Sequence, residues 1–175
     1  ITHHSSQYPL EGYSSLVTAF IALGSNLDDP ERQIRNGLRE LAALPETRFV
    51  SASSLYRSAP VEAPGQHQFV NAVAQVHTEL APQPLLAALL AIENRYGRER
   101  SFRNAPRTLD LDLLLYDAQC LDEPGLSLPH PRMHLRAFVL APLLELAPAC
   151  ILPGLGPAAD WFARCSDQHV LRLAP

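Results

Sequence analysis

The sequence contains no lysine, since all 14 basic residues are arginine. A Walker-A phosphate loop and the ATP site of a protein kinase each place a lysine ammonium on the phosphates, so this absence excludes both. Cysteine is also scarce. Cys120, Cys150 and Cys165 lack the close spacing of a zinc site or a disulfide framework, and we expect reduced thiols in the core. Any nucleotide chemistry here must therefore use arginine and metal ions.

Long apolar runs are absent as well. No segment approaches the roughly 20 uninterrupted apolar residues of a membrane-spanning helix, and the start lacks the pattern of a signal peptide, so we expect a cytoplasmic protein without membrane contact. A net charge of −4 argues against a nucleic-acid surface, because such surfaces are usually basic. Residues 1–15 are polar and begin without methionine, which indicates a tag remnant or flexible tail before a single domain over residues 16–175.

Strand and helix patterns alternate along this domain. Short apolar or alternating runs bounded by turn residues predict strands at 17–23, 49–56, 69–76 and 108–116. Apolar residues at helical spacing predict helices that begin after Asp29, at 82–96 and within 132–140. The order strand, helix, strand, strand, helix, strand is the βαββαβ pattern of ferredoxin-like sandwiches, so the predicted fold class is α+β with an antiparallel sheet covered by helices.

Two prolines bear on the helix ends. Asp29-Pro30 supplies an N-cap followed by proline in the first turn, which is typical of a helix start. Pro142 is expected to end or kink the third helix, because proline lacks the N–H that the helical ladder needs. The proline- and alanine-rich tail after Leu146 gives no clear prediction.

The segment TLDLDLLLY carries two carboxylates at alternate positions. Side chains two apart on a strand point to one face, so Asp110 and Asp112 share a face. The opposite face is predicted to consist of Leu109, Leu111, Leu113 and Leu115. Carboxylates about 6–7 Å apart repel each other unless a cation lies between them, and hard oxygen ligands beside phosphates suit Mg²⁺. The pattern indicates a two-metal phosphate site, although an isolated Asp-x-Asp more often faces solvent.

Arginines crowd the segment just before this strand, in GRERSFRNAPR. Guanidinium groups bind phosphate oxygens in bidentate fashion and stay charged when desolvated, so arginines beside a carboxylate pair favour a polyphosphate held between cations. Pro106 fixes Arg107 next to the strand start and hence near Asp110. The alternative is a solvated basic loop.

Two further polar residues stand out. Asn71 lies within an apolar strand, where a buried carboxamide either pairs with the backbone or offers a donor and an acceptor to the edge of a heterocycle. His130, after Leu128-Pro129, could contact a phosphate or close a turn. Gly24-Ser25-Asn26 follows the first strand, and turn chemistry explains it by default.

Several motifs together resemble the 6-hydroxymethyl-7,8-dihydropterin pyrophosphokinase family of the folate pathway: IALGSN, LYRSAPV, FVNA, GRERSFRNAPRTLDLDLLLY and LPHPRMHLRAFVLAPLLELAP. The resemblance runs from Val17 to about Pro148 and is most specific at PRTLDLD. It implies transfer of a pyrophosphoryl group from ATP to the hydroxymethyl group of 6-hydroxymethyl-7,8-dihydropterin, with release of AMP. It also implies ATP as co-substrate, two Mg²⁺ ions and small-molecule partners only, and we expect a monomer.

The resemblance also implies roles for individual residues. The catalytic residues are Arg98, Arg107, Asp110 and Asp112, of which Asp110 and Asp112 hold the metals. The ATP-binding residues are Glu93, Arg98, Arg100, Arg107, Leu113, His130 and Arg136. The substrate-binding residues are Ser58, Ala59, Val61, Phe69, Asn71, Asp110 and Phe138. Loops at 58–68 and 97–106 are predicted lids over ATP.

Two alternatives share parts of this pattern. A nucleotidyltransferase also pairs a Gly-Ser turn with an Asp-x-Asp, but there the two motifs lie close in sequence, and here most of the domain separates them. An RNA-binding module has the same βαββαβ order, but it displays aromatic residues where this chain has aspartates, and the negative net charge is unfavourable for it.

Overall fold

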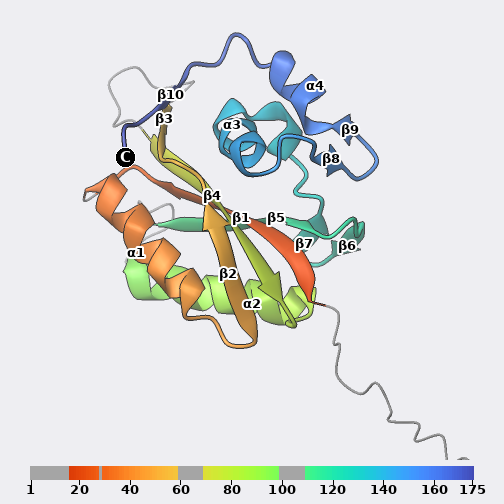
Figure 1. The fold of residues 1–175 in the computed structure, drawn as a ribbon. Helices are drawn as coiled ribbons and strands as arrows, with labels where there is room; N and C mark the ends of the chain where they lie inside the picture. The colour runs from red at the N-terminus through yellow and green to blue at the C-terminus, as the bar shows by residue number, and fades with distance from the viewer. Residues whose placement is uncertain (1–15, 28, 59–68, 99–108) are drawn as a thin grey trace, which may run out of the picture.

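The computed structural model describes residues 16–27, 29–58, 69–98 and 109–175, and Figure 1 shows their arrangement. The strands of the central sheet are β1 (Val17–Ser25), β2 (Thr47–Ala52), β3 (Tyr56–Ser58), β4 (Phe69–Thr78), β5 (Asp110–Tyr116) and β10 (Val170–Arg172). Their order is β10-β3-β4-β1-β5, with β2 also paired to β4, and each of these strand pairs is antiparallel. The predicted antiparallel α+β class is therefore confirmed.

Helices lie on both faces of this sheet. The helices are α1 (Pro30–Ala42), α2 (Pro82–Glu93), α3 (Ala137–Leu146) and α4 (Ala158–Ala163), with the shorter η1 (Asn94–Arg98) and η2 (Met133–Leu135). The remaining strands form two small hairpins, β6 (Leu121–Glu123) with β7 (Leu126–Leu128) and β8 (Ile151–Leu152) with β9 (Gly156–Pro157). In Figure 1, α1 and α2 lie on one side of the sheet and α3 and α4 on the other. Among the described residues, no helix is long and apolar enough to span a bilayer.

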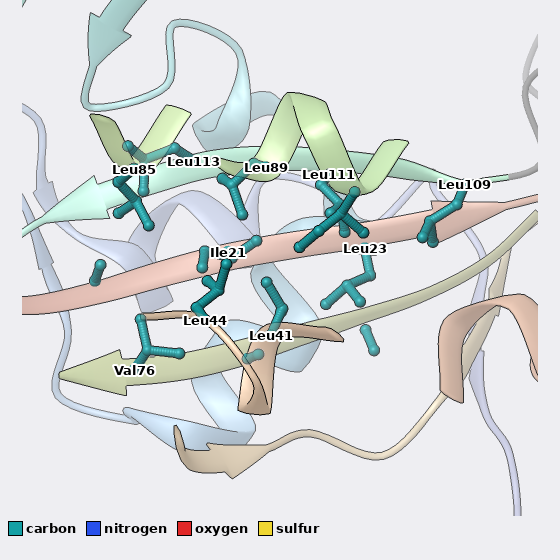
Figure 2. Packing of buried hydrophobic residues seen from close by; sticks show 14 of the residues in the cluster. Ile21, Leu23, Leu41, Leu44, Val76, Leu85, Leu89, Leu109, Leu111 and Leu113 are labelled. Atoms are coloured by element: carbon teal, nitrogen blue, oxygen red, sulfur yellow. The ribbon is translucent and has the colours of Figure 1, made fainter. Parts of the chain in front are cut away.

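The sheet separates two hydrophobic cores. The first core packs the sheet against α1 and α2 through Ile21, Leu23, Ile34, Leu41, Leu85, Leu89, Leu109, Leu111 and Leu113, as Figure 2 shows in part. The second core packs the sheet against α3 and the C-terminal segment through Phe20, Val73, Leu114, Leu115, Leu140, Leu143, Leu152 and Cys165. Because strand residues alternate between faces, this division assigns a face to every strand position.

Helix α1 begins as the sequence predicts. The Asp29 carboxylate accepts a hydrogen bond from the backbone N–H of Arg32 at 3.4 Å, and Pro30 occupies the first turn. Gly37 lies on the buried side of the helix, where a Cβ would come within 2.9 Å of Leu23 Cδ2. The absence of a side chain at this position lets α1 lie close to β1.

The predicted strand at 49–56 is in fact two strands. β2 ends at Ala52 and β3 begins at Tyr56, and both pair with β4. Three residues, 53–55, stand opposite only Ala72 and Val73, so this edge carries one extra residue relative to β4. The alternation of the sequence is compatible with either arrangement, so the break was missed.

The predicted face of Leu115 is wrong. Ile21 pairs with Leu113 but the preceding residue, Phe20, pairs with Leu115, so Leu114 is an extra residue in β5. Leu113 therefore belongs to the first core and Leu115 to the second. Asp110 and Asp112 precede this bulge, and their shared face is unaffected.

Helix α3 is offset from its prediction. It spans Ala137–Leu146 and contains Pro142, so the proline does not end it. Pro142 is buried, and this burial offsets the one backbone hydrogen bond that proline cannot make. The helix begins later than predicted because residues 133–135 form the separate turn η2.

The tail after Leu146 is part of the fold. Leu152, Ala158 and Cys165 are buried in the second core, and β10 extends the sheet beyond β3. All three cysteines are free, but Cys120 is exposed, so the expectation of a core position is wrong for this residue. Cys120 lies in the turn between β5 and β6, outside either core.

Candidate active site

Three neighbouring strands place an amide and a carboxylate on either side of a glycine. Gly24 on β1 is the register partner of Asn71 on β4 and of Asp110 on β5. The three positions share the face of the sheet that α3 partly covers, because Leu23, which precedes Gly24, and the residues on either side of Asn71 and of Asp110 belong to the first core. A Cβ at Gly24 would lie 3.1 Å from Asn71 Oδ1, so the glycine keeps open the space beside the amide.

Asn71 is held in place by the next strand. Its side chain is buried, and its Nδ2 donates a hydrogen bond to Ser58 Oγ at 2.9 Å. Ser58 is itself buried at the end of β3, and its register partner is Phe69, which is half-buried. Tyr56 pairs directly with Asn71 in the same strand pair. β3 therefore determines how the carboxamide is oriented.

The two aspartates lie at the start of β5 as the sequence predicts. Asp110 is half-buried beside Gly24, and Asp112 is exposed and pairs with Ala22. Within the described residues no three His, Cys, Asp or Glu side chains gather closely enough to form a metal site without help. Two carboxylates on one face of a strand suit hard divalent cations whose remaining ligands are water or phosphate oxygens, which is how Mg²⁺ is usually held.

His130 is close enough to Asp112 for their charges to interact. Burial lowers the pKa of His130 below its ordinary 6.5, Asp112 opposes this shift, and the charges of Arg136 and Arg132 reinforce it. His130 Nδ1 accepts a hydrogen bond from the Arg132 backbone N–H at 3.2 Å, so the proton of the neutral ring is on Nε2. The His130 backbone N–H donates to the Leu114 carbonyl at 2.9 Å, which ties this segment to β5. The residue therefore offers an uncharged donor beside the aspartates.

A cation and an aromatic ring lie together at the start of α3. The Arg136 guanidinium carbon is 5.6 Å from the centroid of the Phe138 ring, which is a cation–π distance. Both side chains are half-buried, and Phe138 packs against the second core on the same side of the sheet as Asn71. The site thus has a ring-stacking surface and a positive charge.

Two predicted ATP contacts lie on the opposite side of β5. Glu93 is buried at the end of α2, and its Oε2 accepts a hydrogen bond from the Leu111 backbone N–H at 3.3 Å. Leu113 is buried in the first core, so only its backbone could reach a ligand. Arg98 ends η1, and only its main chain is described. Ala59, Val61, Arg100 and Arg107 lie outside the described residues, as do residues 59–68 and 99–106 of the predicted lids.

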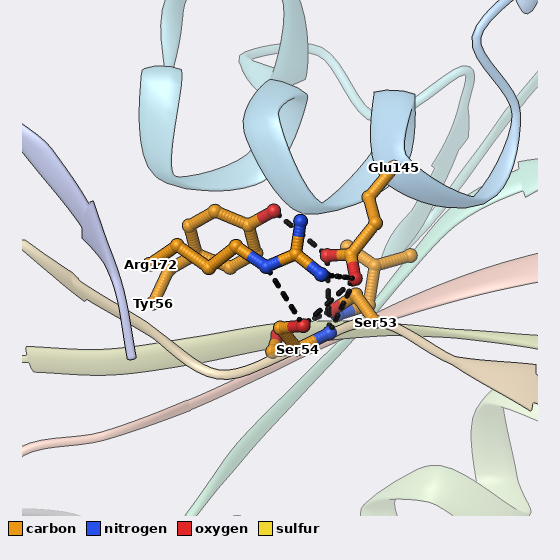
Figure 3. Close-up of polar contacts among 6 residues, drawn as sticks. Ser53, Ser54, Tyr56, Glu145 and Arg172 are labelled. Carbon is orange, nitrogen blue, oxygen red and sulfur yellow. Dashed lines mark hydrogen bonds and ion pairs between the residues drawn. The ribbon is translucent and has the colours of Figure 1, made fainter. Parts of the chain in front are cut away.

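One polar cluster near the site was not predicted. Figure 3 shows the carboxylate of Glu145, on α3, surrounded by Ser54, Tyr56 and Arg172. Glu145 is 91 positions from Ser54 and 89 from Tyr56, and Arg172 is 118 positions from Ser54. The only available sequence signal was Glu145 itself, the single charged residue of α3.

Comparisons with known proteins agree with one family. A profile described as 7,8-dihydro-6-hydroxymethylpterin-pyrophosphokinase matches residues 20–148. The 2-amino-4-hydroxy-6-hydroxymethyldihydropteridine pyrophosphokinase of Pseudomonas aeruginosa is 49% identical over 154 residues, which cover 88% of this chain and 95% of the relative. The protein of the same name from Haemophilus influenzae is 41% identical over 160 residues, which cover 91% of this chain and 100% of the relative.

A solved structure shares the fold. The structure described as HPPK-DHPS in complex with substrates aligns with a TM-score of 0.69 at 10% identity, over 87% of this chain. The alignment covers 44% of that protein, so this chain spans less than half of its length. At this identity the likeness shows the fold alone.

The profile and these relatives show that the protein is an enzyme of the pyrophosphokinase class, which uses ATP as co-substrate. The chain belongs to the 7,8-dihydro-6-hydroxymethylpterin-pyrophosphokinase family, whose reaction is pyrophosphoryl transfer to hydroxymethyldihydropterin in folate biosynthesis. The family and the enzyme class that the motifs predict are confirmed.

Proposed function

We propose that the face of the sheet that carries Asn71 and Asp110 binds the reduced pterin and the ATP phosphates side by side. The chain then transfers the terminal pyrophosphoryl group of ATP to the hydroxymethyl oxygen of 6-hydroxymethyl-7,8-dihydropterin and releases AMP. The observation that carries the proposal is the row Asn71, Gly24, Asp110 across three strands. Asn71 and Asp110 are two strand spacings apart, roughly 10 Å, a span suited to a bicyclic ring with its hydroxymethyl group toward the carboxylates.

The pterin would lie at the β3–β4 side of this row. The Asn71 carboxamide is buried and oriented by Ser58, so it can present a donor or an acceptor to the edge of the ring. Phe138 supplies an aromatic face for stacking from α3. Phe69, Ala59 and Val61 complete the proposed wall of the pocket.

The metals would lie at the β5 side. Asp110 and Asp112 are the proposed ligands of two Mg²⁺ ions, and their common face and oxygen donors support this assignment. Bound Mg²⁺ would supply charge neutralisation at the phosphates. Asp110 borders both the proposed metal site and the proposed pterin site, because its register partner Gly24 is also the register partner of Asn71.

The ATP phosphates would be held by donors around the aspartates. His130 can donate from Nε2 without bringing a charge, and Arg136 supplies a guanidinium near Phe138. The remaining proposed ATP residues are Glu93, Leu113, Arg98, Arg100 and Arg107, with Arg98 and Arg107 also catalytic. Positioning of the hydroxymethyl oxygen in line with the β-phosphorus, together with positive charge on the phosphate oxygens, would account for catalysis.

The same proposal extends to the architecture. The antiparallel order β5-β1-β4-β2, with α1 and α2 on one face, supports a ferredoxin-like βαββαβ sandwich. In this view α3, α4 and β10 are additions that build the second face. We also propose that residues 16–175 form one domain and that this domain acts as a monomer. The prediction of a tag remnant or flexible tail at residues 1–15 lies outside the described residues.

The test is a measurement of AMP formation. The protein is incubated with ATP, Mg²⁺ and the pterin alcohol, and matched reactions omit either the pterin or the Mg²⁺. The proposal requires AMP and the pterin diphosphate in equal amounts, and only when all three components are present. AMP that forms without the pterin would indicate an ATP hydrolase, and labelled AMP on an acceptor would indicate a nucleotidyltransferase.

A further inference from the structure

The strand that orients Asn71 follows an irregular stretch of the sheet. Between Ala52 and Tyr56, residues 53–55 stand opposite the two residues 72 and 73 of β4. Ser53 continues the hydrogen bonding to β4. Its N–H donates to the Val73 carbonyl at 2.8 Å, and its Oγ accepts from the Val73 N–H at 2.9 Å. The next backbone N–H, that of Ser54, does not bond to β4 and is directed toward Glu145. An extra residue of this kind leaves backbone groups that need another partner.

Glu145 supplies this partner. The Ser54 N–H donates to both carboxylate oxygens of Glu145, at 3.1 and 3.0 Å, and Ser54 Oγ donates to Oε1 at 2.8 Å. A helix residue on the facing layer thus completes the hydrogen bonding of the bulge. Figure 3 shows the carboxylate pointing from α3 toward the sheet at this point.

The same carboxylate fixes two further elements. Tyr56 Oη donates to Glu145 Oε2 at 2.7 Å, and the Arg172 guanidinium approaches Oε1 at 3.1 Å. Arg172 Nε also donates to Ser54 Oγ at 3.0 Å. A carboxylate accepts about four hydrogen bonds, so Glu145 is close to saturated. It joins α3, β3 and β10 at one point.

The negative charge of Glu145 strengthens these hydrogen bonds. Burial alone would raise its pKa, but the hydrogen bonds from Tyr56 and Ser54 and the charge of Arg172 outweigh burial, so the pKa is lowered. The group is therefore an anion at neutral pH, and its hydrogen bonds are charge-assisted. A neutral amide of the same size could accept fewer of them.

The path from Glu145 to the pterin pocket is short. Tyr56, which Glu145 holds by its hydroxyl, is the register partner of Asn71. Two residues further along β3, Ser58 Oγ accepts the hydrogen bond from Asn71 Nδ2. A change in the position or register of β3 would therefore rotate or release the carboxamide. No bond in this path involves Asp110, Asp112 or His130.

We infer that Glu145 is a positioning residue for pterin recognition, which acts through the bulge at Ser54 and through Tyr56 to set the orientation of Asn71. The inference depends on the proposed function, because it assumes that Asn71 reads the pterin. It predicts an effect on the pterin half of the site and none on the ATP half.

The test compares steady-state constants for both substrates. Glu145→Gln keeps the shape and removes the charge, and we expect it to raise the KM for the pterin about tenfold and to change the KM for ATP by less than about twofold. Tyr56→Phe and Arg172→Gln each remove one partner of the carboxylate, and each is expected to raise the pterin KM by about threefold. Glu123→Gln is the matched control, because Glu123 is exposed on β6, where its Oε2 accepts a hydrogen bond from Gln83 Nε2.

The outcomes separate this inference from the proposed function. Asn71→Ala is measured in parallel: a normal pterin KM in that variant would refute the proposed pocket itself. A raised pterin KM in Asn71→Ala together with normal values in Glu145→Gln would overturn only the role of Glu145. Equal changes in both KM values would indicate a general structural role and would also overturn it. If Glu145→Gln does not fold, Tyr56→Phe and Arg172→Gln decide the question by the same comparison.

Discussion

Asn71 and Asp110 come from strands that do not pair with each other, yet both are register partners of Gly24. The strand between them contributes a residue without a side chain, so the surface between the amide and the carboxylate is backbone. Any other residue at this position would place at least a methyl group within 3.1 Å of Asn71 Oδ1. Gly24 is therefore explained by its neighbours across the sheet rather than by a turn.

Gly24→Ala should weaken pterin binding. The added methyl group forces the Asn71 carboxamide to move by a few tenths of an ångström, or out of its rotamer at a cost of about 0.5–1.5 kcal/mol, which corresponds to a two- to tenfold rise in the pterin KM. The control is Gly37→Ala, the same substitution on the opposite face, where the new methyl group would meet Leu23. It should alter thermal stability at most. An unchanged pterin KM in Gly24→Ala would show that the space beside Asn71 is not used.

Asp112→Asn should abolish turnover without unfolding the protein. The amide keeps the size of the side chain but removes the charge that would hold a divalent cation, so we expect kcat/KM to fall by more than about 100-fold. Asp112 is exposed, so the free energy of unfolding should change by less than about 0.5 kcal/mol. Asp110→Asn should show the same loss of turnover. Asp122→Asn, on the exposed hairpin strand β6, is the matched control, and comparable activity in Asp112→Asn and Asp122→Asn would refute the metal assignment.

The Tyr56 hydroxyl should lose its proton only at high pH, and this deprotonation should destabilise the folded state. Burial first, and then the hydrogen bond to the negatively charged Glu145, raise the pKa of Tyr56 from 10.0 to about 12. The folded state therefore retains a proton that the unfolded chain loses, so this contribution to stability is complete below pH 10 and disappears as the pH rises toward 12. Urea unfolding measured across this range should show a steeper loss for the wild type than for Tyr56→Phe. Parallel curves for the two proteins would contradict the raised pKa.

Leu89→Ala should destabilise the first core. Leu89 on α2 is fully buried against the sheet, and removal of its branched end leaves a cavity that costs about 2–5 kcal/mol of unfolding free energy. Leu135→Ala is the matched control, because Leu135 is 56% exposed in η2 and the same substitution there should cost little. Equal losses in a denaturant titration would contradict the burial of Leu89 in the first core.

The sequence was sufficient to predict features that depend on local periodicity. Asp110 and Asp112 alternate with leucines, and the N-cap at Asp29 precedes a helical stripe, so both could be predicted from a few neighbouring residues. The bulge at Leu114 could not be predicted, because every residue from Leu113 to Tyr116 is apolar or aromatic and no alternation marks the shift. Its effect is visible only once β5 is paired with β1.

The residues that the sequence failed to predict are joined over long distances. Glu145 meets Ser54 and Tyr56 across about 90 positions, and no local pattern marks these residues as partners. The tail after Leu146 was uninformative for a similar reason. The buried residues of this tail complete the second core, and the other half of that core lies on strands that precede the tail in the sequence. Such contacts depend on topology rather than on propensity.

The outer edge of β3 is covered by β10, and the two are linked by Arg172 and Ser54, which are 118 residues apart. On a ribosome that adds roughly 5–20 residues per second, the nascent β3 therefore waits on the order of 10 seconds for its covering strand. During that time it presents an open row of backbone donors and acceptors, the kind of edge that recruits strands from other chains. Slower translation of the last third of the message should consequently increase aggregation of newly made protein.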